Sequence, residues 1–206
     1  MEKFLKGLKW FFHSYIWLFV LGILTDIISK NIIVNNMEPG QSVPLIKGFL
    51  HITYSVNNAA AFSMGTSNPV ANLIMYSCIA GIASIAIIVY YAKAHKKMHA
   101  LLKASLMLIL AGALGNLVDR LFYTPEYLGP GITDRGVVDF IDFCGIWHAI
   151  FNIADSCICI GAAIMLLYFI IDEVKERKKH SEPKAKQEKV LSKTEKEIQN
   201  QESESK

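Results

Sequence analysis

The sequence predicts an all-α integral membrane protein: a bundle of four transmembrane helices that carries a small extracytoplasmic β-sheet. The first observation behind this prediction is composition, since 52% of the 206 residues are hydrophobic and the formal net charge is only +3. A soluble domain has a more polar composition. The second is that the chain contains four apolar runs close to the about 20 residues that a helix needs to span a bilayer. These runs cover residues 11–34, 70–91, 101–122 and 148–171.

The distribution of basic residues predicts the orientation of these four helices. Basic side chains cluster before the first run, between the second and third, and after the fourth: Lys3, Lys6, Lys9, Lys93, Lys96, Lys97, Lys103, Lys175, Arg177, Lys178 and Lys179. By the positive-inside rule these segments are cytoplasmic, so we expect both termini inside and residues 35–69 and 123–147 outside. The first run is too long for a signal peptide and lacks a small-residue cleavage site, so we expect it to be retained.

The composition changes after the fourth run. From residue 172 onwards Lys and Glu alternate without aromatic residues, a pattern typical of a solvated segment that is disordered or loosely helical. The sequence therefore predicts a membrane-embedded domain over residues 1–171 and a charged cytoplasmic tail over residues 172–206.

Two outer segments have the pattern of β-strands. Apolar and polar residues alternate from Leu50 to Val56, and "GVVDFIDF" at residues 136–143 has similar character. Alternation of strand-forming residues is typical of a strand with one buried face. We expect the two segments to pair in a small antiparallel sheet at the outer face of the bundle.

Several polar side chains lie near the outer ends of the predicted helices. An ionisable group at the centre of a spanning helix costs about 2.5 to 3.5 kcal/mol on insertion scales, so such groups face a bundle interior or water. Within each helix the spacing of three or four residues puts them on one face. The set comprises Asp26 and Lys30 in the first helix, Asn116, Asp119 and Arg120 in the third, and Asn152 and Asp155 in the fourth.

This predicted polar cluster has a structural and a catalytic interpretation. Asp26, Lys30, Asp119 and Arg120 could form ion pairs that hold the helices in register, and for the two basic residues both interpretations remain open. Asp155 fits the structural interpretation less well, because its own helix face carries no basic residue. Its carboxylate must be hydrogen-bonded by neighbours such as Asn152, or remain protonated.

A second carboxylate could come from the outer strand "VVDFIDF", which contains Asp139 and Asp142. Alternation along a strand puts these two on opposite faces, so only one can point into the cluster, and residue spacing leaves the choice open. Two carboxylates that share a wet site can hold one proton between them, activate water as a base and protonate a leaving amine as an acid. That is the chemistry of an aspartyl peptidase.

Five motifs, in this order along the chain, resemble those of one known family. They are "DIISK" at residues 26–30, "NNAAAFS" at 57–63, "GNLVDR" at 115–120, "VVDF" at 137–140 and "FNIADS" at 151–156. Together they resemble the lipoprotein signal peptidases, or signal peptidases II, of bacterial inner membranes. The resemblance covers residues 12–171. The chain departs from the family pattern at four places: Ile27 replaces a common Gln, Ala59 replaces the usual Gly, Ala149 stands where Pro is frequent, and the link over residues 121–136 is longer. The last three departures concern the shape of the outer lid and of the substrate cleft that the resemblance implies.

The resemblance implies a reaction and a set of roles. It selects Asp139 over Asp142 as the catalytic partner of Asp155, and it implies cleavage of a prolipoprotein before a diacylglyceryl-modified cysteine. By the same resemblance, four residues would position the two aspartates or the substrate, namely Asn57, Asn116, Arg120 and Asn152. Asp26 would support the fold, together with Lys30 and Asp119. The expected partners are diacylglyceryl-modified prolipoproteins and membrane lipids, with no nucleic acid and no cofactor.

Three rival functions are weaker. An assembly factor without catalysis would not need the second carboxylate. A proton- or ion-coupled transporter would also place carboxylates in a helical bundle, but it should show internal repeats or broken helices near the midplane. A metalloprotease would need a zinc motif, and "HKKMH" at residues 95–99 lacks its Glu and lies in a basic cytoplasmic loop. We therefore expect no metal site.

Overall fold

The computed structural model describes residues 2–58, 66, 68–144 and 146–204, with side chains described up to residue 178 apart from that of Lys3. The segment 59–65, which holds Ala59 and most of the "NNAAAFS" motif, lies outside the described residues. The chain divides into two compact units, Met1–Met165 and Leu166–Lys206. The predicted site residues all fall in the first unit.

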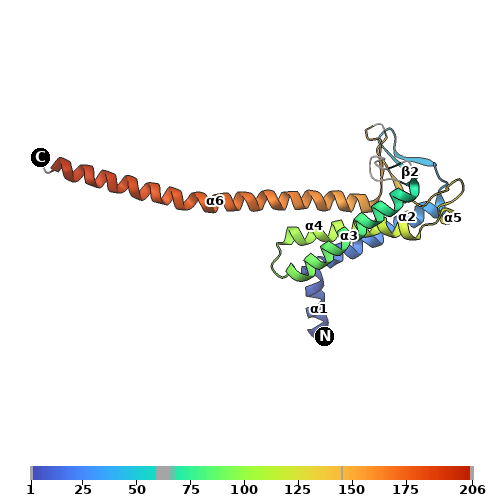
Figure 1. Ribbon diagram of the computed structural model, residues 1–206, viewed down its shortest axis with the longest axis horizontal. Coiled ribbons are helices and arrows are strands. Elements are labelled where there is room, and N and C mark those ends of the chain that lie inside the picture. The colour runs from blue at the N-terminus through green and yellow to red at the C-terminus, as the bar shows by residue number, and fades with distance from the viewer. Residues whose placement is uncertain (1, 59–65, 67, 145, 205–206) are drawn as a thin grey trace. The chain divides into compact units, whose positions relative to one another are not determined.

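The described part of the chain is mostly helical (Figure 1). Its helices are α1 (Glu2–His13), α2 (Ile16–Asn36), α3 (Pro69–Ala94), α4 (Ala100–Phe122), α5 (Pro125–Leu128) and α6 (Ile153–Glu204). Within the described residues, four helical segments are long and apolar enough to cross a membrane: α2, α3, α4 and residues 153–178 of α6. The prediction of a helical membrane protein with four spans is confirmed.

The first predicted span begins too early. We expected a continuous helix from residue 11, but α1 ends at His13 and α2 begins at Ile16. Tyr15 between them has a left-handed backbone, with φ of 61°. The turn is held by buried Ser14, whose hydroxyl donates to the Phe11 carbonyl and whose own carbonyl accepts from the Tyr91 hydroxyl of α3. A left-handed non-glycine residue needs this kind of support, because its Cβ crowds the backbone.

The fourth predicted span also begins later than expected. We placed its start at residue 148, but α6 starts at Ile153. Asn152 stops the helix from extending further back, because its side-chain oxygen accepts the backbone N–H of Asp155 at 2.8 Å. An asparagine that bonds in this way is a helix N-cap.

The sheet is four-stranded and antiparallel, in the order β1-β2-β3-β4. Its strands are β1 (Ser42–Ile46), β2 (Leu50–Asn57), β3 (Val137–Asp142) and β4 (Ile150–Phe151). The two predicted strands correspond to β2 and β3, which pair with Asn57 opposite Val137 and Ser55 opposite Asp139. The prediction of a small antiparallel sheet is confirmed, and two shorter strands extend it.

A hydrophobic core joins the sheet to the helices. It contains Ile33 of α2, Tyr54 of β2, Val138 and Phe140 of β3, Tyr123 just before α5, and Leu128 of α5. The Tyr54 hydroxyl donates to the Leu128 carbonyl at 2.6 Å, which fastens the link between α4 and β3 to the sheet. The edge of β3 that carries Asp139 is therefore fixed against the bundle.

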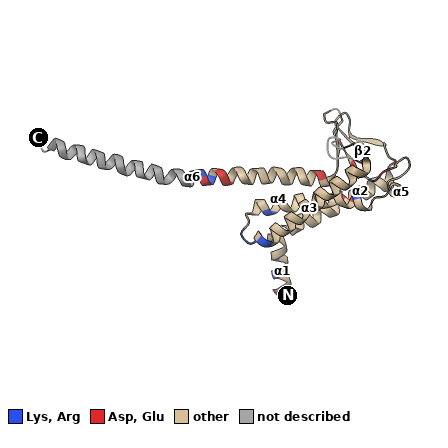
Figure 2. Ribbon diagram, in the orientation of Figure 1, with Lys and Arg blue, Asp and Glu red and all other residues tan. Residues whose placement is uncertain are grey.

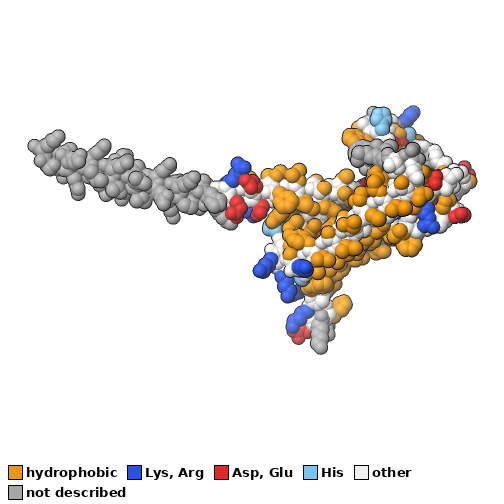
Figure 3. Space-filling model, viewed as in Figure 1, with side chains coloured by type: hydrophobic (Ala, Val, Ile, Leu, Met, Phe, Trp, Pro, Cys, Tyr) orange, Lys and Arg blue, Asp and Glu red, His pale blue; other side chains and the backbone are white. Residues whose placement is uncertain are grey.

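The surface of α2, α3 and α4 is apolar, as expected of helices that face lipid (Figure 3). The helix α4 is the central one, because half of its apolar stretch is buried, against 6% for α3. Glycines let neighbours approach α4 closely: a Cβ on Gly112 would lie 2.2 Å from the Ala154 carbonyl oxygen, and one on Gly115 would lie 2.6 Å from the Asp26 carboxylate. These small residues therefore allow close helix packing in the C-terminal half of α4.

Candidate active site

A buried ion cluster lies at the centre of the predicted polar group. The ammonium of Lys30 is 2.8 Å from Asp26 and 3.0 Å from Asp119, and all three side chains are fully buried. The same ammonium donates to the Asn116 side-chain oxygen at 3.1 Å. Of the two interpretations of Lys30, the geometry therefore supports a structural ion pair.

The two carboxylates of this cluster also hold the backbone. Asp26 accepts the N–H of Ala154 at 2.8 Å, and Asp119 accepts the N–H of Val138 at 3.0 Å. Each of these N–H groups belongs to the residue just before Asp155 or Asp139. The ion cluster thus holds the backbone of the residue that precedes each candidate catalytic aspartate.

Asp155 lies in the first turn of α6 and is bonded on both of its carboxylate oxygens. One oxygen accepts from the Asn116 side-chain amide at 2.8 Å, and the other accepts the backbone N–H of Asn152 at 3.2 Å. Because Asn152 caps the N–H of Asp155 in return, the two residues form a reciprocal capping box. Of the two alternatives that the sequence left for Asp155, the geometry supports a carboxylate hydrogen-bonded by neighbours such as Asn152.

Asp139 lies in β3 and is 3% exposed. Its carboxylate accepts from the side-chain amides of Asn152, at 2.7 Å, and Asn57, at 3.1 Å. Burial, followed by the negative charge of Asp155, raises the pKa of Asp139 to about 7. Asp139 can therefore keep a proton near neutral pH.

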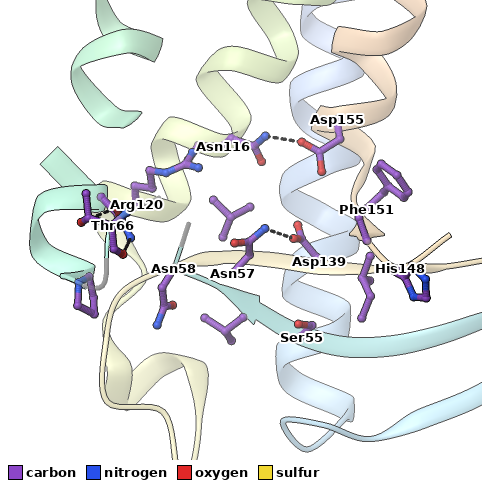
Figure 4. Close-up of a pocket in the computed structure, with 16 residues that line it drawn as sticks. Ser55, Asn57, Asn58, Thr66, Asn116, Arg120, Asp139, His148, Phe151 and Asp155 are labelled. Carbon is purple, nitrogen blue, oxygen red and sulfur yellow. Dashed lines mark hydrogen bonds between the residues drawn. The ribbon is translucent and has the colours of Figure 1, made fainter. Parts of the chain in front are cut away.

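The two carboxylates line the same cavity, which has a volume of about 480 Å³ (Figure 4). In Figure 4 they lie on one side of the cavity, and Arg120 lies across from them. The lining residues are Ser55, Val56, Asn57, Asn58, Thr66, Pro69, Asn72, Asn116, Arg120, Val137, Asp139, His148, Ala149, Ile150, Phe151 and Asp155.

The predicted site residues divide into two layers. Asn57, Asn116, Arg120, Asp139 and Asp155 line the cavity. The other four, Asn152, Asp26, Lys30 and Asp119, are fully buried. Asn152 and Lys30 donate to the lining residues Asp139 and Asn116. Asp26 and Asp119 accept the backbone N–H groups of Ala154 and Val138, which directly precede the lining residues Asp155 and Asp139. The structure thus gathers all nine predicted residues into one connected network, with the ion cluster underneath.

Arg120 behaves differently from Lys30. Its guanidinium donates to the Asn116 carbonyl at 3.0 Å and lies 5.7 Å from the centre of the Tyr76 ring. Among the described residues it forms none of the ion pairs, and it lines the cavity. Its charge is thus available to a group that enters the cavity.

Asp142 does not belong to this network. It is half-buried near the end of β3 and accepts the Thr53 hydroxyl at 2.8 Å. Of the described residues around the cavity, the carboxylates are those of Asp139 and Asp155. The choice between Asp139 and Asp142, which residue spacing left open, is therefore made by the pairing of β3 with its neighbours.

Sequence reasoning missed five polar residues of the lining: Ser55, Asn58, Thr66, Asn72 and His148. Asn72 is buried in the first turn of α3, where its side chain accepts the Thr66 N–H at 2.7 Å and donates to the Thr66 carbonyl at 2.9 Å. A signal existed for it, because Asn72 is a polar residue inside an apolar run. The buried side-chain oxygen of Asn58 accepts no hydrogen bond from the described residues.

The comparisons with known proteins identify the family of this chain. Residues 18–171 match the family model described as signal peptidase (SPase) II. A lipoprotein signal peptidase of Fusobacterium nucleatum subsp. nucleatum is 35% identical over 165 residues, which cover 80% of this chain and 91% of that protein.

Two solved structures have the same fold, and both are described as bacterial membrane enzymes studied by the in meso method. The first, at 2.3 Å resolution, has a TM-score of 0.63 and 30% identity, covering 78% of this chain and 89% of that one. The second, at 1.9 Å, has a TM-score of 0.60 and 31% identity, covering 76% and 92%. With its family match, its catalogued relative and this shared fold, the chain belongs to the signal peptidase II family.

Proposed function

We propose that this protein is an intramembrane aspartyl endopeptidase that removes the signal peptide from bacterial prolipoproteins by cleaving before the diacylglyceryl-modified cysteine. Membership of the signal peptidase II family makes it a peptidase. The observation that carries the mechanism is that Asp139 and Asp155 line one cavity and that the charge of Asp155 raises the pKa of Asp139. Two coupled carboxylates are the minimum that an aspartyl mechanism requires.

In the proposed reaction the two aspartates have different roles. Asp155 takes a proton from a water molecule, whose oxygen attacks the scissile carbonyl carbon. Asp139, which can hold a proton near neutral pH, donates it to the leaving amine as the carbon–nitrogen bond breaks. One water is consumed, and each aspartate ends in the protonation state in which the other began.

The surrounding polar residues position these groups. Asn57 and Asn152 hold the Asp139 carboxylate, and Asn116 holds that of Asp155. Arg120 lies across the cavity and is suited to bind the backbone carbonyls of the substrate or the oxyanion that forms in the reaction. Asp26, Lys30 and Asp119 support this arrangement from beneath.

We further propose that the cavity and the sheet face outward from the bacterial inner membrane, with both termini in the cytoplasm. The basic residues of the α3–α4 turn lie at the opposite end of the bundle from α5 (Figure 2), and cytoplasmic segments are rich in Lys and Arg. Reporter fusions after Lys97 and Lys179 should read cytoplasmic, and fusions near Gln41 and Thr133 should read external. An external reading at Lys97 would place the cavity on the wrong face.

We also propose that residues 1–171 form the peptidase and that the tail over residues 172–206 is dispensable for cleavage. The tail alternates Lys and Glu and has no aromatic residues. A truncation after Arg177 should insert and cleave like the full chain. Loss of cleavage by a folded truncation would assign the tail a role in the reaction.

The decisive experiment supplies the purified protein with two forms of one prolipoprotein, with and without the diacylglyceryl group. We expect cleavage of the lipidated form only, just before the modified cysteine, as read by mass spectrometry of the products. Equal cleavage of both forms would remove the lipid requirement. Cleavage of neither by a folded protein would overturn the assignment.

A further inference from the structure

The helix α1 has two chemically distinct faces. At helical spacing, Phe4, Leu5, Leu8, Phe11 and Phe12 fall on one side, and Glu2, Lys6, Lys9 and His13 fall on the other. The apolar face is not covered by the protein, since Phe4 is 72% exposed and Phe12 is 53% exposed. A helix with such faces lies at a boundary between an apolar and a polar medium.

The corner between α1 and α2 fixes where that boundary is. The membrane-spanning stretch of α2 begins at Ile16, directly after the left-handed Tyr15. The Tyr91 hydroxyl of α3 bonds the Ser14 carbonyl and so ties the corner to the bundle. Because of this break, α1 does not continue the line of α2 (Figure 1). The helix α1 therefore meets the first residues of the spanning segment at the surface of the bilayer.

The same end of the protein carries a group of positive charges. The lysines Lys93, Lys96 and Lys97 follow Tyr91 along the chain and are exposed. They gather at the end of α3 from which α1 departs (Figures 2 and 3). Together with Lys6 and Lys9 they would face the headgroups of the same leaflet. Lysines at a lipid surface attract anionic headgroups and are screened beyond a Debye length.

We propose that α1 lies in the plane of the membrane and binds anionic phospholipid, with its Phe and Leu face at the acyl boundary and its lysines among the headgroups. A short helix of this composition binds bilayers through buried apolar area and through attraction to anionic lipid. The match to the family model begins at residue 18, so α1 lies outside the matched part of the chain. The proposal therefore does not depend on the proteolytic activity.

A bilayer explains the exposed face better than a second copy of the chain does. The corner holds α1 beside the lipid that already surrounds α2, whose Leu21, Leu24 and Ile28 are about half exposed. Pairing two copies of α1 would instead bring their lysines together at the flanks of the contact. Like charges at close range are unfavourable.

The test is hydrogen exchange on the full-length protein, in nanodiscs of phosphatidylcholine alone and of phosphatidylcholine mixed with phosphatidylglycerol. We expect the amides of residues 4–13 to exchange slowly in both and more slowly with phosphatidylglycerol. Each lysine near an anionic surface is worth about fivefold in binding. The double variant Lys6→Gln/Lys9→Gln should therefore lose most of the extra protection, whereas Lys47→Gln, at an exposed turn of the sheet, should keep it.

A second variant tests the apolar face separately. Leu8→Ser/Phe12→Ser should speed exchange of these amides in both lipids, because it removes apolar contacts and leaves the charges. Fast exchange of α1 in both lipids for the unaltered protein would overturn the proposal. Protection that is the same in both lipids and is unchanged by Lys6→Gln/Lys9→Gln would also overturn it. Protection that is lost when each nanodisc holds a single copy would overturn it too.

Discussion

Asn152 and Asp155 cap each other at the start of α6: the Asn152 side chain accepts the Asp155 N–H at 2.8 Å, and the Asp155 carboxylate accepts the Asn152 N–H at 3.2 Å. This reciprocal bond sets the direction of a carboxylate that lines the cavity. The side-chain amide nitrogen of Asn152 meanwhile donates to Asp139 at 2.7 Å. One side chain therefore starts a membrane helix and joins the two aspartates.

These two tasks of Asn152 can be separated by substitution. Asn152→Ser keeps an oxygen that can cap α6 but loses the amide that donates to Asp139, whereas Asn152→Ala loses both. We expect both variants to lose activity, mainly through a lower kcat. Only Asn152→Ala should also lose stability, by the about 1 kcal/mol that an N-cap contributes. Cleavage kinetics and thermal unfolding in detergent measure the two effects. Full activity in Asn152→Ser would show that its amide is not needed.

Replacement of the aspartates by asparagine tests the proposed chemistry. Asp139→Asn and Asp155→Asn should each reduce turnover by several orders of magnitude, and the double variant should be little worse, because the two act as one unit. Asp142→Asn is the matched control on the same strand and should stay active, since Asp142 bonds Thr53 outside the cavity. An active Asp139→Asn, or a folded but inactive Asp142→Asn, would mean that the wrong carboxylate was assigned.

The raised pKa of Asp139 predicts the pH dependence of cleavage. With the pKa of Asp139 at about 7, this residue loses its proton as the pH rises through neutrality and can no longer protonate the leaving amine. We expect kcat/KM to fall above about pH 7. A profile that stays flat to pH 9 would exclude Asp139 as the proton donor.

The same pKa predicts an effect on stability. The pKa of Asp139 lies above its ordinary value of 3.8, so the folded state binds the proton more tightly than the unfolded state does. Its contribution to stability is therefore lost as the pH rises from about 4 to 7, with a slope near 1.4 kcal/mol per pH unit. Asp139→Asn should thus raise the melting temperature at pH 8 and change it least at pH 4. The opposite trend would contradict the pKa of Asp139.

Replacement of Lys30 should destabilise the protein strongly, although Lys30 does not line the cavity. Lys30→Met leaves Asp26 and Asp119 buried together without a cation, which costs about 3 to 5 kcal/mol for a broken buried pair. Lys47→Met, at an exposed position, should be neutral. Adding Asp26→Asn and Asp119→Asn to Lys30→Met should restore much of the stability. Unfolding in detergent measures all three, and an unchanged Lys30→Met would show that the ion cluster contributes little.

Gly112 tests the close contact between α4 and α6. A Cβ there would lie 2.2 Å from the Ala154 carbonyl oxygen, whereas a Cβ on Gly81 of α3 would meet nothing within 4 Å. Gly112→Ala should destabilise the protein by about 1 to 3 kcal/mol or more, because overpacking a close contact has a cost of this size. Gly81→Ala should be neutral or slightly stabilising, because alanine favours the helix. Equal melting temperatures for the two variants would contradict the contact.

Periodicity was sufficient to predict the polar network but not its partners. Spacing of three or four residues placed Asp26 with Lys30 and Asn116 with Asp119, and the structure brings these four together. The division of roles between Lys30 and Arg120 did not follow from sequence. It depends on which side of α4 faces α2 and which faces the cavity, and only packing determines that.

The missed boundaries have local causes that a hydropathy pattern does not report. Residues 11–34 read as one apolar run, yet Tyr15 turns left-handed because Ser14 is bonded by Tyr91, which lies 77 residues away in sequence. Strand β1 is exposed along its whole length and contains Pro44, so neither alternation nor propensity marks it. Strand β4 has only two residues, too few to leave a pattern in the sequence, and it is defined by its pairing with Ile141 and Asp142 of β3.

The arrangement of the ion cluster also bears on how the chain enters the membrane during synthesis. Asp26 and Lys30 are four residues apart on the same helix and 2.8 Å from each other, so this pair can form as soon as α2 is made. The helix can then partition into lipid with these opposite charges compensated, before α4 is synthesised. When α4 follows, Asp119 finds the Lys30 ammonium in place, and the order of synthesis matches the order in which the charges need partners.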